Sequence, residues 1–344
     1  MDQAVNVALV GFGYAGRVFH APLIEAVSGL KLAGIVSSRP AAIDAAKPGT
    51  RVIPTLESAL RDDGVDLVVI ATPNALHASQ AHAALSAGKH VVVDKPFTVT
   101  VAEAEAVCAQ AERAGRVLSV FHNRRWDSDF LTLQALIGRD ALGDVRYLES
   151  HFDRYRPQVR DRWRERRGSG AGLWFDLGPH LIDQVLQLFG PPDDISVDRA
   201  MLRDGAQVDD YFHATLSYAK RRVVLHASML APVHDVRFLV HGTRGSYVKE
   251  GLDTQESTLV AGRTPHDITW GQDPRPGLLT TVDDADRRSE SVPNEPGDYC
   301  RFYAAVRDAI RDGAPNPVSS REALEVMRWL ERGVPIADAT VSPS

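Results

Sequence analysis

The chain has 344 residues, of which 44% are hydrophobic and 24% are charged, a composition typical of a globular protein with room for two domains. Its formal net charge of -6 argues against nucleic acid or an anionic membrane surface as the main partner. The two cysteines, Cys108 and Cys300, form neither a disulfide framework nor a metal motif. The apolar stretch at residues 5–10 is too short for a signal peptide and no run could cross a bilayer, so we expect a cytoplasmic protein.

The first third of the chain alternates short apolar segments with alanine-rich segments. The expected strands are Val5–Val10, Lys31–Val36, Leu67–Ile70, His90–Val93 and Val117–Phe121, and the clearest helices are Ala75–Ala87 and Ala102–Ala114. Continuous apolar strands separated by helices are typical of a parallel sheet that is covered on both faces. The pattern therefore predicts a doubly wound α/β domain of the Rossmann type over residues 1–122.

The pattern changes after Phe121. Helices are expected at Ser128–Ile137, Pro179–Phe189, Tyr299–Arg311 and Arg321–Arg332, and strands at Val145–Phe152, Ile195–Leu202, Tyr211–Tyr218, Arg222–Met229 and Val236–His241. Residues 264–297, rich in Pro, Gly and Asp, are expected to form a long loop, and the Ser/Pro tail to be frayed. Consecutive strands with separate helices predict an α+β domain over residues 123–340, built on a large, mostly antiparallel sheet.

Gly11-Phe12-Gly13-Tyr14-Ala15-Gly16 matches the G-x-G-x-x-G pattern of dinucleotide-binding loops. The match follows the first expected strand and precedes a helical segment, which is the setting that the motif requires. Gly11 would permit the tight turn, Gly13 would let the backbone approach the pyrophosphate, and Gly16 would allow close contact between helix and strand. The amides of the helix N-terminus would then face the phosphates. Turn glycines without a ligand are the alternative.

The end of the second expected strand bears on the choice of cofactor. An NAD site usually places Asp or Glu there, about 20 residues past the glycine motif. Here the sequence reads Ser37-Ser38-Arg39, with no carboxylate until Asp44. Two hydroxyls and a guanidinium suit a 2′-phosphate, so the segment favours NADP. A polar turn whose serine caps a helix is the alternative.

Lys95 follows the fourth of the expected strands, within Asp94-Lys95-Pro96. Ligands of open α/β sheets bind at the carboxyl ends of the parallel strands, so Lys95 could stabilise negative charge on a substrate oxygen during hydride transfer. An ordinary surface lysine is the equally weighted alternative.

Asp176 and His180 lie four residues apart around Pro179, which suits the first turn of a helix. A carboxylate beside an imidazole fixes its tautomer, so His180 could act as the base that removes a hydroxyl proton. The alternative is that Asp176 caps the helix and His180 is a packed core residue.

Seven arginines fall between Arg154 and Arg167, interleaved with Asp161 and Glu165. In an acidic chain we interpret this cluster as a salt-bridged loop over the active site or at a subunit contact, rather than as a nucleic-acid site. Tyr155, Arg156 and Trp163 could line a substrate pocket. The histidines show no paired spacing such as H-E-x-x-H, and His77 and His82 are poorly placed to share an ion, so we predict no metal.

Together these residues resemble the Gfo/Idh/MocA oxidoreductase family over nearly the whole chain. The resemblance rests on Gly11–Gly16, Ala71-Thr72-Pro73-Asn74 followed by His77, Gly88-Lys89-His90-Val91, Lys95-Pro96 and the pair Asp176 and His180. Within the family the likeness is greatest to NADP-dependent scyllo-inositol dehydrogenases, in Phe121-His122-Asn123-Arg124-Arg125-Trp126-Asp127, Tyr155-Arg156-Pro157, Arg162-Trp163-Arg164-Glu165 and Val208-Asp209-Asp210-Tyr211-Phe212.

The resemblance implies a catalytic triad of Lys95, Asp176 and His180, and a homodimer or homotetramer joined through the antiparallel sheet. It implies that the cofactor is bound by Gly11, Gly13, Tyr14, Ala15, Gly16, Ser37, Ser38, Arg39, Thr72, Pro73, Asn74, His77, Asp94, Lys95 and Asn123. The substrate would be bound by Lys95, Asn123, Arg124, Tyr155, Trp163, Asp176 and His180. The family usually has Glu where this chain has Asp94, so a contact that orients Lys95 would start from a carboxylate one methylene shorter.

The function expected from these features is NADP-dependent interconversion of a cyclic polyol and its ketone, with scyllo-inositol and 2-keto-inositol as the favoured pair. A dehydrogenase of an aldose or of a deoxy or anhydro sugar is the nearest alternative, since loops of the second domain set the substrate. A regulator that binds NADP without turnover is the alternative from another class. The presence of Lys95, Asp176 and His180 together argues against it.

Overall fold

The computed structural model describes residues 4–233, 236–283 and 286–334. Tertiary contacts divide the chain into two compact units. Unit 1 consists of Met1–Asn123, Gln255–Trp270 and Asp298–Met327, and unit 2 of Arg124–Thr254, Gly271–Gly297 and Arg328–Ser344. The first unit therefore includes two later segments of the chain that lie beyond the expected boundary at residue 122. The Ser/Pro tail falls outside the described residues.

The described part of unit 1 holds a six-stranded parallel sheet with the order β3-β2-β1-β4-β5-β6. Its strands are β1 (Val5–Val10), β2 (Leu30–Val36), β3 (Val52–Ile53), β4 (Leu67–Ile70), β5 (His90–Val93) and β6 (Leu118–Val120). The central runs of Val, Ile and Leu are buried because helices cover both faces of the sheet. The predicted Rossmann sheet is confirmed, with β3 as an additional short edge strand.

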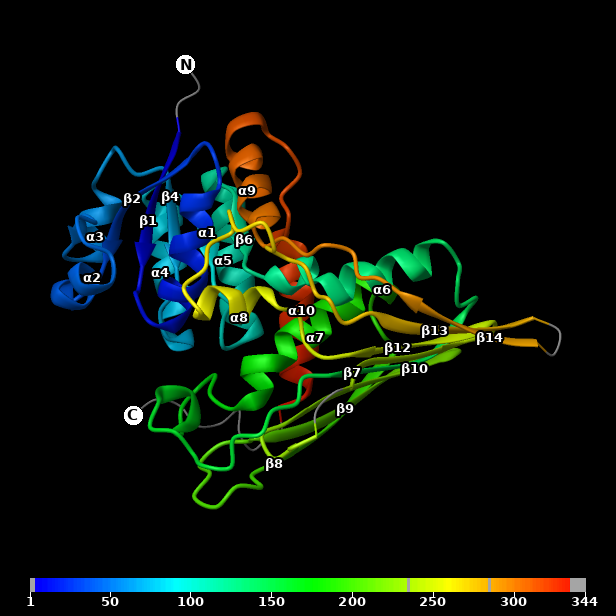
Figure 1. Ribbon diagram of the computed structural model, residues 1–344. Coiled ribbons are helices and arrows are strands. Elements are labelled where there is room, and N and C mark those ends of the chain that lie inside the picture. The colour runs from blue at the N-terminus through cyan, green and yellow to red at the C-terminus, as the bar shows by residue number, and fades with distance from the viewer. Residues whose placement is uncertain (1–3, 234–235, 284–285, 335–344) are drawn as a thin grey trace. The chain divides into compact units, whose positions relative to one another are not determined.

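Helices flank this sheet on both sides (Figure 1). They are η1 (Gly16–His20), α1 (Ala21–Ala26), α2 (Pro40–Ala46), α3 (Leu56–Leu60), η2 (Asn74–Leu76), α4 (His77–Ser86), α5 (Val101–Ala114), α8 (Gln255–Val260) and α9 (Cys300–Asp312). Helix α1 packs against β2 and α9, whereas α4 packs against β4, β5 and α5. From β1 the chain crosses to β2 on one side, and from β4 it crosses to β5 on the other side. Right-handed crossovers therefore place α1 and α4 on opposite faces of the sheet. The strand order reverses between β1 and β4, where open α/β sheets bind their ligands.

The described part of unit 2 holds an eight-stranded sheet with the order β14-β13-β12-β11-β7-β10-β9-β8. Its strands are β7 (Val145–His151), β8 (Asp194–Ala200), β9 (Tyr211–Tyr218), β10 (Arg221–Ser228), β11 (Val236–Gly242), β12 (Gly245–Glu250), β13 (Gly277–Asp283) and β14 (Asp286–Val292). Among the described pairs, β7 and β10 run parallel and the others antiparallel. This confirms the predicted large, mostly antiparallel sheet.

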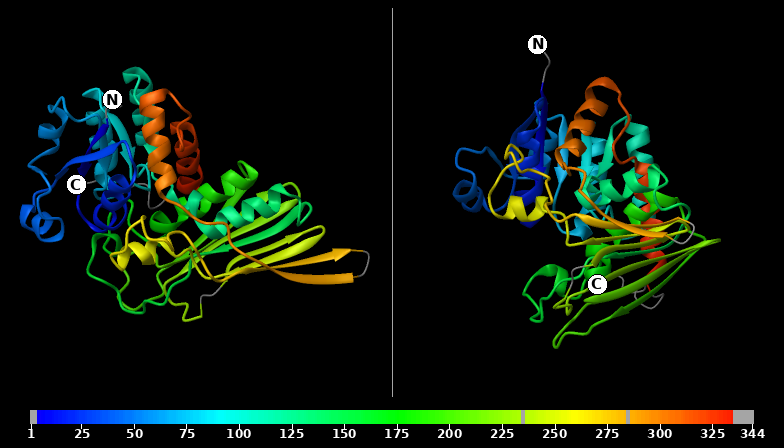
Figure 2. Two further views of the ribbon diagram at one scale, coloured as in Figure 1. Left: turned by 45° about the horizontal axis from the view of Figure 1, so that its top comes forward. Right: turned by 45° about the vertical axis from the view of Figure 1, so that its right-hand side comes forward.

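One face of this sheet is covered by helices α6 (Ser128–Gly138) and α7 (Leu173–Phe189), as Figures 1 and 2 show. Strand residues alternate accordingly, with Leu148 and Ser150 buried under the helices and Glu149 and His151 half-buried on the other face. The short helices η3 (Asn123–Trp126) and η4 (Trp163–Glu165) lie in the connections, and α10 (Ser320–Arg332) spans the division between the units.

Two sequence predictions for this region were wrong. Helix α7 begins at Leu173 rather than at Pro179, so Pro179 lies inside the helix and Asp176 lies in its first turn. The predicted loop at residues 264–297 contains the β13–β14 hairpin. Strand β14 is almost entirely polar and exposed, so it lacks the apolar alternation by which a strand is recognised; its pairing with β13 holds it in the sheet.

The described chain contains no helix long and apolar enough to traverse a lipid bilayer.

Candidate functional site

The loop between β1 and the first helical turn is shaped by two glycines. Gly11 has φ +94°, and a Cβ there would lie 2.6 Å from the carbonyl oxygen of Ala71 at the end of β4. A Cβ on Gly16 would lie 2.3 Å from the carbonyl oxygen of Gly11. Both positions therefore exclude any side chain, because the loop, the strand ends and the helix are in close contact.

Gly13 differs from its two neighbours in the motif. A Cβ at Gly13 would meet no atom of the described residues within 4 Å. The helical segment starts directly after it, and Arg17 N–H donates to the Gly13 carbonyl at 3.0 Å. Open space beside Gly13 and the amides of Tyr14 and Ala15 at the start of a helix are what a pyrophosphate needs. The loop therefore fits a dinucleotide.

The end of β2 presents short polar side chains. Ser37 Oγ accepts a hydrogen bond from Arg39 N–H at 3.1 Å, which shapes the turn into α2. Ser38 and Arg39 are exposed, and Asp44 lies further along on the exposed side of α2. The donors at this strand end are thus hydroxyls, backbone amides and a guanidinium, which can bind a phosphate group.

The Asp94 carboxylate lies beneath the turn that carries Lys95. Asp94 is buried, and its Oδ1 accepts the Lys95 backbone N–H at 2.9 Å. The same oxygen lies 3.8 Å from Nε2 of His20. The Lys95–Pro96 peptide bond is cis, and Lys95 itself is half-buried at the end of β5. Asp94 therefore holds the backbone of Lys95 through a contact that its short side chain can make.

His20 connects Asp94 to helix α9. The His20 ring is fully buried, and its Nδ1 lies 2.6 Å from the Tyr303 hydroxyl. Burial and the nearby charge of Asp94 raise the pKa of Tyr303 well above its ordinary value, so this hydroxyl keeps its proton and can donate a hydrogen bond to Nδ1. The other ring nitrogen, Nε2, faces Asp94.

His77 joins the loops that follow β4 and β5. Its Nε2 lies 2.9 Å from the carbonyl oxygen of Thr72, and its Nδ1 lies 2.9 Å from that of Pro96. The Thr72 hydroxyl donates to Gln80 on α4 at 2.7 Å. His77 is buried, so its ring fixes the position of the loop that carries Lys95 relative to the Thr72-Pro73-Asn74 turn. Asn123 is buried after β6, at the same carboxyl edge of the sheet.

In unit 2, Asp176 and His180 lie one helical turn apart on α7, so their side chains share one face of the helix. His180 is buried, whereas the Asp176 side chain is 16% exposed and one of its oxygens lies 3.6 Å from Nε of Arg164. Arg164 lies over the ring of Trp163 at 4.8 Å. The structure thus brings Asp176, His180, Arg164 and Trp163 together at the start of α7.

Helix α7 is held by buried polar contacts. Arg125 makes two hydrogen bonds to the Asp183 carboxylate, at 2.9 and 2.6 Å. Arg237 donates to Gln184 at 2.7 Å and to Asp129 at 3.1 Å. All of these residues are at least nine-tenths buried. Because both ends of each contact are desolvated, the orientation of α7, and with it of Asp176 and His180, is closely fixed.

The arginine-rich segment is a salt-bridged loop, as predicted. Glu165 is buried and bonds Arg162 at 2.6 Å and Arg203 at 3.0 Å. Burial alone would raise the pKa of Glu165, but the Arg160 amide and the Arg162 guanidinium outweigh it and lower that pKa. Arg166 pairs with Asp161 at the surface.

Two residues that the sequence placed at the substrate have different surroundings. Arg124 is buried, pairs with Asp127 at 3.3 Å, and stacks on Phe152 at 4.6 Å. Tyr155 is 55% exposed.

Apart from Arg124 and Tyr155, the sequence-predicted residues form one group in each unit. Gly11–Gly16, Ser37–Arg39, Thr72–His77, Asp94, Lys95 and Asn123 gather at the carboxyl edge of the first sheet, and Trp163, Asp176 and His180 gather at α7 in the second unit. Sequence reasoning missed His20 and Tyr303, which support Lys95. The only signal for His20 was its position four residues after Gly16, and Tyr303 carried none.

Two family models match the chain: an oxidoreductase family NAD-binding Rossmann fold over residues 5–122, and an oxidoreductase family C-terminal alpha/beta domain over residues 134–336. The uncharacterized oxidoreductase YdgJ of Escherichia coli is 52% identical over 334 residues, covering 97% of this chain and 96% of its own. The scyllo-inositol 2-dehydrogenase (NADP(+)) IolW of Bacillus subtilis is 39% identical over 331 residues, covering 96% and 92%. A solved structure of YPO2259 from Yersinia pestis, described as an oxidoreductase, is 51% identical with TM-score 0.93 and covers 98% of this chain and 95% of its own.

Proposed function

Because the chain belongs to the Gfo/Idh/MocA family of oxidoreductases, we propose that it interconverts a ring secondary alcohol of a cyclic polyol and the corresponding ketone, with NADP as the hydride carrier. The observation that carries the proposal is the glycine loop, which is open at Gly13 and lies on the same edge of the sheet as the buried Asp94–Lys95 turn. Scyllo-inositol and 2-keto-inositol are the favoured pair, supported by the 39% identity to the Bacillus subtilis enzyme.

The choice of NADP is supported by the end of β2. Ser37, Ser38 and Arg39 offer hydroxyls, amides and positive charge, and no carboxylate is present among them to repel a 2′-phosphate. Gly11 and Gly16 would shape the loop around the pyrophosphate, and Gly13, Tyr14 and Ala15 would contact it through the backbone. The Thr72-Pro73-Asn74 turn and Asn123 would border the nicotinamide half, with His77 holding that turn in position. When bound, NADP supplies the carbon that accepts or donates hydride.

Three side chains would act at the reacting hydroxyl group of the substrate. His180 removes the hydroxyl proton as the alcohol is oxidised, and returns it in the reverse direction. Asp176 stabilises the imidazolium that forms. The Lys95 ammonium binds the substrate oxygen and stabilises the negative charge that develops there, and Asp94 holds the Lys95 backbone for this task. Asn123, Arg124, Tyr155 and Trp163 are the further residues that we assign to substrate binding.

The exposed face of the second sheet would join copies of the chain into a homodimer or homotetramer.

Initial rates of wild-type protein, followed by the absorbance of reduced nicotinamide, test the substrate and the cofactor together. The panel contains inositol stereoisomers and aldoses, each with NADP and with NAD. We expect turnover of scyllo-inositol with a preference for NADP. Turnover of an aldose alone would contradict the inositol assignment and favour the second candidate, a sugar dehydrogenase. A preference for NAD would contradict the role of Ser37, Ser38 and Arg39.

Lys95→Ala separates an enzyme from a regulator that binds NADP without turnover. Loss of the ammonium removes charge stabilisation at the reacting oxygen, so kcat/KM should fall by about a hundredfold or more. NADP binding, measured by quenching of tryptophan fluorescence, should persist. Lys47→Ala, which removes a half-exposed lysine paired with Glu25, is the matched control and should leave kcat/KM unchanged. A wild-type protein that binds NADP but oxidises nothing in the panel would favour the regulator.

A further inference from the structure

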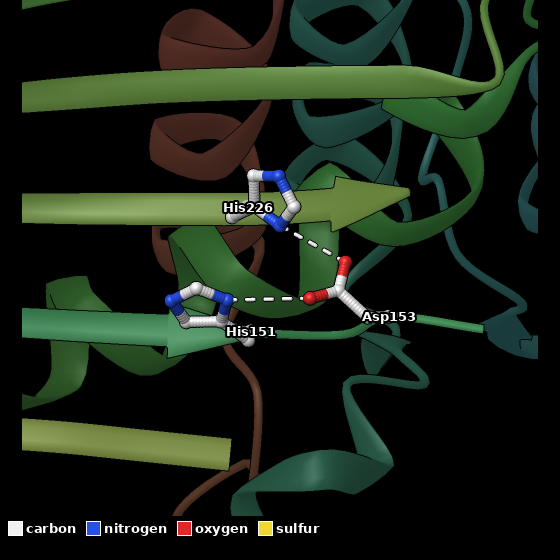
Figure 3. Close-up of side chains that lie close together, drawn as sticks. All are labelled: His151, Asp153 and His226. Carbon is white, nitrogen blue, oxygen red and sulfur yellow. Dashed lines mark hydrogen bonds and ion pairs between the residues drawn. The ribbon is translucent and has the colours of Figure 1, made fainter. Parts of the chain in front are cut away.

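A second cluster of chemically active side chains lies in unit 2, on the face of the sheet opposite to α6 and α7. His151 on β7 and His226 on β10 are direct partners in the parallel register, so their side chains stand beside each other on one face. Asp153 follows His151 by two residues. Figure 3 shows the three side chains turned toward one another, with the helices on the far side of the strands.

The donor atoms of these residues converge. His226 Nδ1 lies 2.9 Å from Asp153 Oδ1, and His151 Nδ1 lies 3.3 Å from Asp153 Oδ2. One ligand atom from each residue falls within 4.8 Å of the other two. Four ligands around a zinc ion at about 2.0–2.1 Å lie roughly 3.3 Å from one another. The nitrogen and carboxylate atoms are therefore close to that spacing, and small side-chain rotations would complete it.

Both imidazoles present a nitrogen to the cluster. His151 Nε2 lies 2.8 Å from Glu149 Oε2, so a neutral ring that donates there carries its lone pair on Nδ1, which faces Asp153. This is the carboxylate–histidine arrangement that orients metal-binding imidazoles. Nδ1 of His226 is buried and lies 2.9 Å from the Asp153 carboxylate. That nitrogen thus points into the cluster.

The Asp153 carboxylate is held in a fixed orientation. The Ser228 amide donates to Asp153 Oδ1 at 2.8 Å, which fixes the plane of the carboxylate. With Glu149, the cluster holds two carboxylates around its imidazoles, a charge distribution that attracts a cation.

We propose that His151, His226 and Asp153 bind a divalent transition-metal ion, with zinc as the best fit to two imidazole nitrogens and one carboxylate. His213, which pairs with His226 across the β9–β10 register and lies 6.0 Å from it between ring centroids, is the nearest further imidazole. The ion would join β7 to β10. The histidines of the sequence show no paired spacing within one helix, which is why no metal was predicted, whereas these ligands come from strands β7 and β10.

Zinc binding to the full-length protein tests the proposal. Protein stripped with a chelator is titrated with zinc chloride in a calorimeter, and its metal content is measured after gel filtration. Wild-type protein should bind one zinc ion per chain. His226→Ala should weaken binding by at least a hundredfold, and Glu149→Gln, which removes only the orienting carboxylate, by ten- to a hundredfold. His241→Ala is the matched control: His241 also lies on this sheet and bonds Ser246 at 2.8 Å, and its loss should leave zinc affinity unchanged.

Two outcomes would overturn the proposal: wild-type protein that binds no zinc up to millimolar concentration, or wild-type affinity in His226→Ala. Circular dichroism establishes that each variant is folded. If His226→Ala does not fold, Asp153→Asn takes its place, and the visible absorption of cobalt-substituted wild-type protein reports coordination without any variant. A cobalt spectrum identical to that of free aqueous cobalt would also overturn the proposal. The zinc titration measures metal binding and not turnover, so failure of either idea leaves the other intact.

Discussion

His90 shows how burial decides the charge of a single side chain. Its ring lies half-buried at the start of β5, and Nδ1 accepts the Val117 N–H at 3.0 Å. Burial, together with the nearby positive charge of Arg116, lowers the pKa of His90 from 6.5 to about 4. A protonated ring has no free nitrogen to accept this bond. The neutral ring therefore belongs to the folded state, and its protonation opposes folding.

The stability of the protein should consequently fall as the pH drops from 6.5 to 4. In this window the unfolded chain binds a proton at His90 that the folded chain does not, so acid favours unfolding. At about 1.4 kcal/mol per pKa unit the full shift corresponds to about 3.5 kcal/mol, and solvent screening of the partly exposed ring reduces the His90 contribution to about 2 to 3 kcal/mol. His90→Asn keeps an oxygen that can accept the Val117 N–H but cannot be protonated.

Urea unfolding of both proteins at pH 7 and at pH 4.5 measures this contribution. Between pH 7 and pH 4.5, the free energy of unfolding should decrease less in His90→Asn than in wild type. An equal pH dependence in the two proteins would contradict the role of His90.

At the scale of elements, the buried Arg237 illustrates how α7 is positioned. The guanidinium bonds Asp129 on α6, Gln184 on α7 and Ser150 on β7, so a single side chain ties two helices to the sheet. Arg237 is thus the centre of a buried hydrogen-bond network, although no sequence motif marks it. The position of His180 depends on this network through α7.

Arg237→Met should destabilise the protein by about 3 to 5 kcal/mol, because it leaves the Asp129 carboxylate buried without its partner. Arg146→Met is the matched control, since Arg146 pairs with Asp144 at the surface and should contribute less than about 1 kcal/mol. Thermal and urea unfolding of the two variants provide the comparison. Equal losses in both variants would show that the Arg237 network does not stabilise α7.

The elements differ in how readily the sequence reveals them. Strands β1, β4 and β5 are short runs of Val, Ile and Leu that are buried on both faces, so composition and spacing were sufficient to predict them. Strand β14 is polar and exposed, and only pairing with β13 holds it in place, which no local pattern reports. The start of α7 was misplaced because Pro179 suits a first turn, whereas the helix begins at Leu173, where Asp209 accepts the Trp174 amide at 2.7 Å.

In the whole molecule, some site residues can be predicted from local sequence patterns, whereas others depend on tertiary contacts. The glycine loop and Lys95 follow from where the strands end, because the carboxyl edge of a parallel sheet gathers such residues. The support of Lys95 by Asp94, His20 and Tyr303 depends on the contact between His20 and Tyr303, which are 283 residues apart in the sequence. The His151, Asp153 and His226 cluster likewise depends on the pairing of strands β7 and β10. Tertiary contacts of this kind leave no periodic signal.

The proposed function rests on hydride transfer between the substrate and NADP, which isotope labelling measures. Scyllo-inositol that carries deuterium at its ring carbons is incubated with NADP and wild-type protein, and the reduced cofactor is analysed by mass spectrometry. We predict that the cofactor gains deuterium, and that His180→Asn, which keeps NADP binding but lacks the base, forms at least a hundredfold less labelled product. Labelled product formed equally fast by His180→Asn would contradict the role of His180. Bound NADP with no label transferred would contradict the proposed reaction itself.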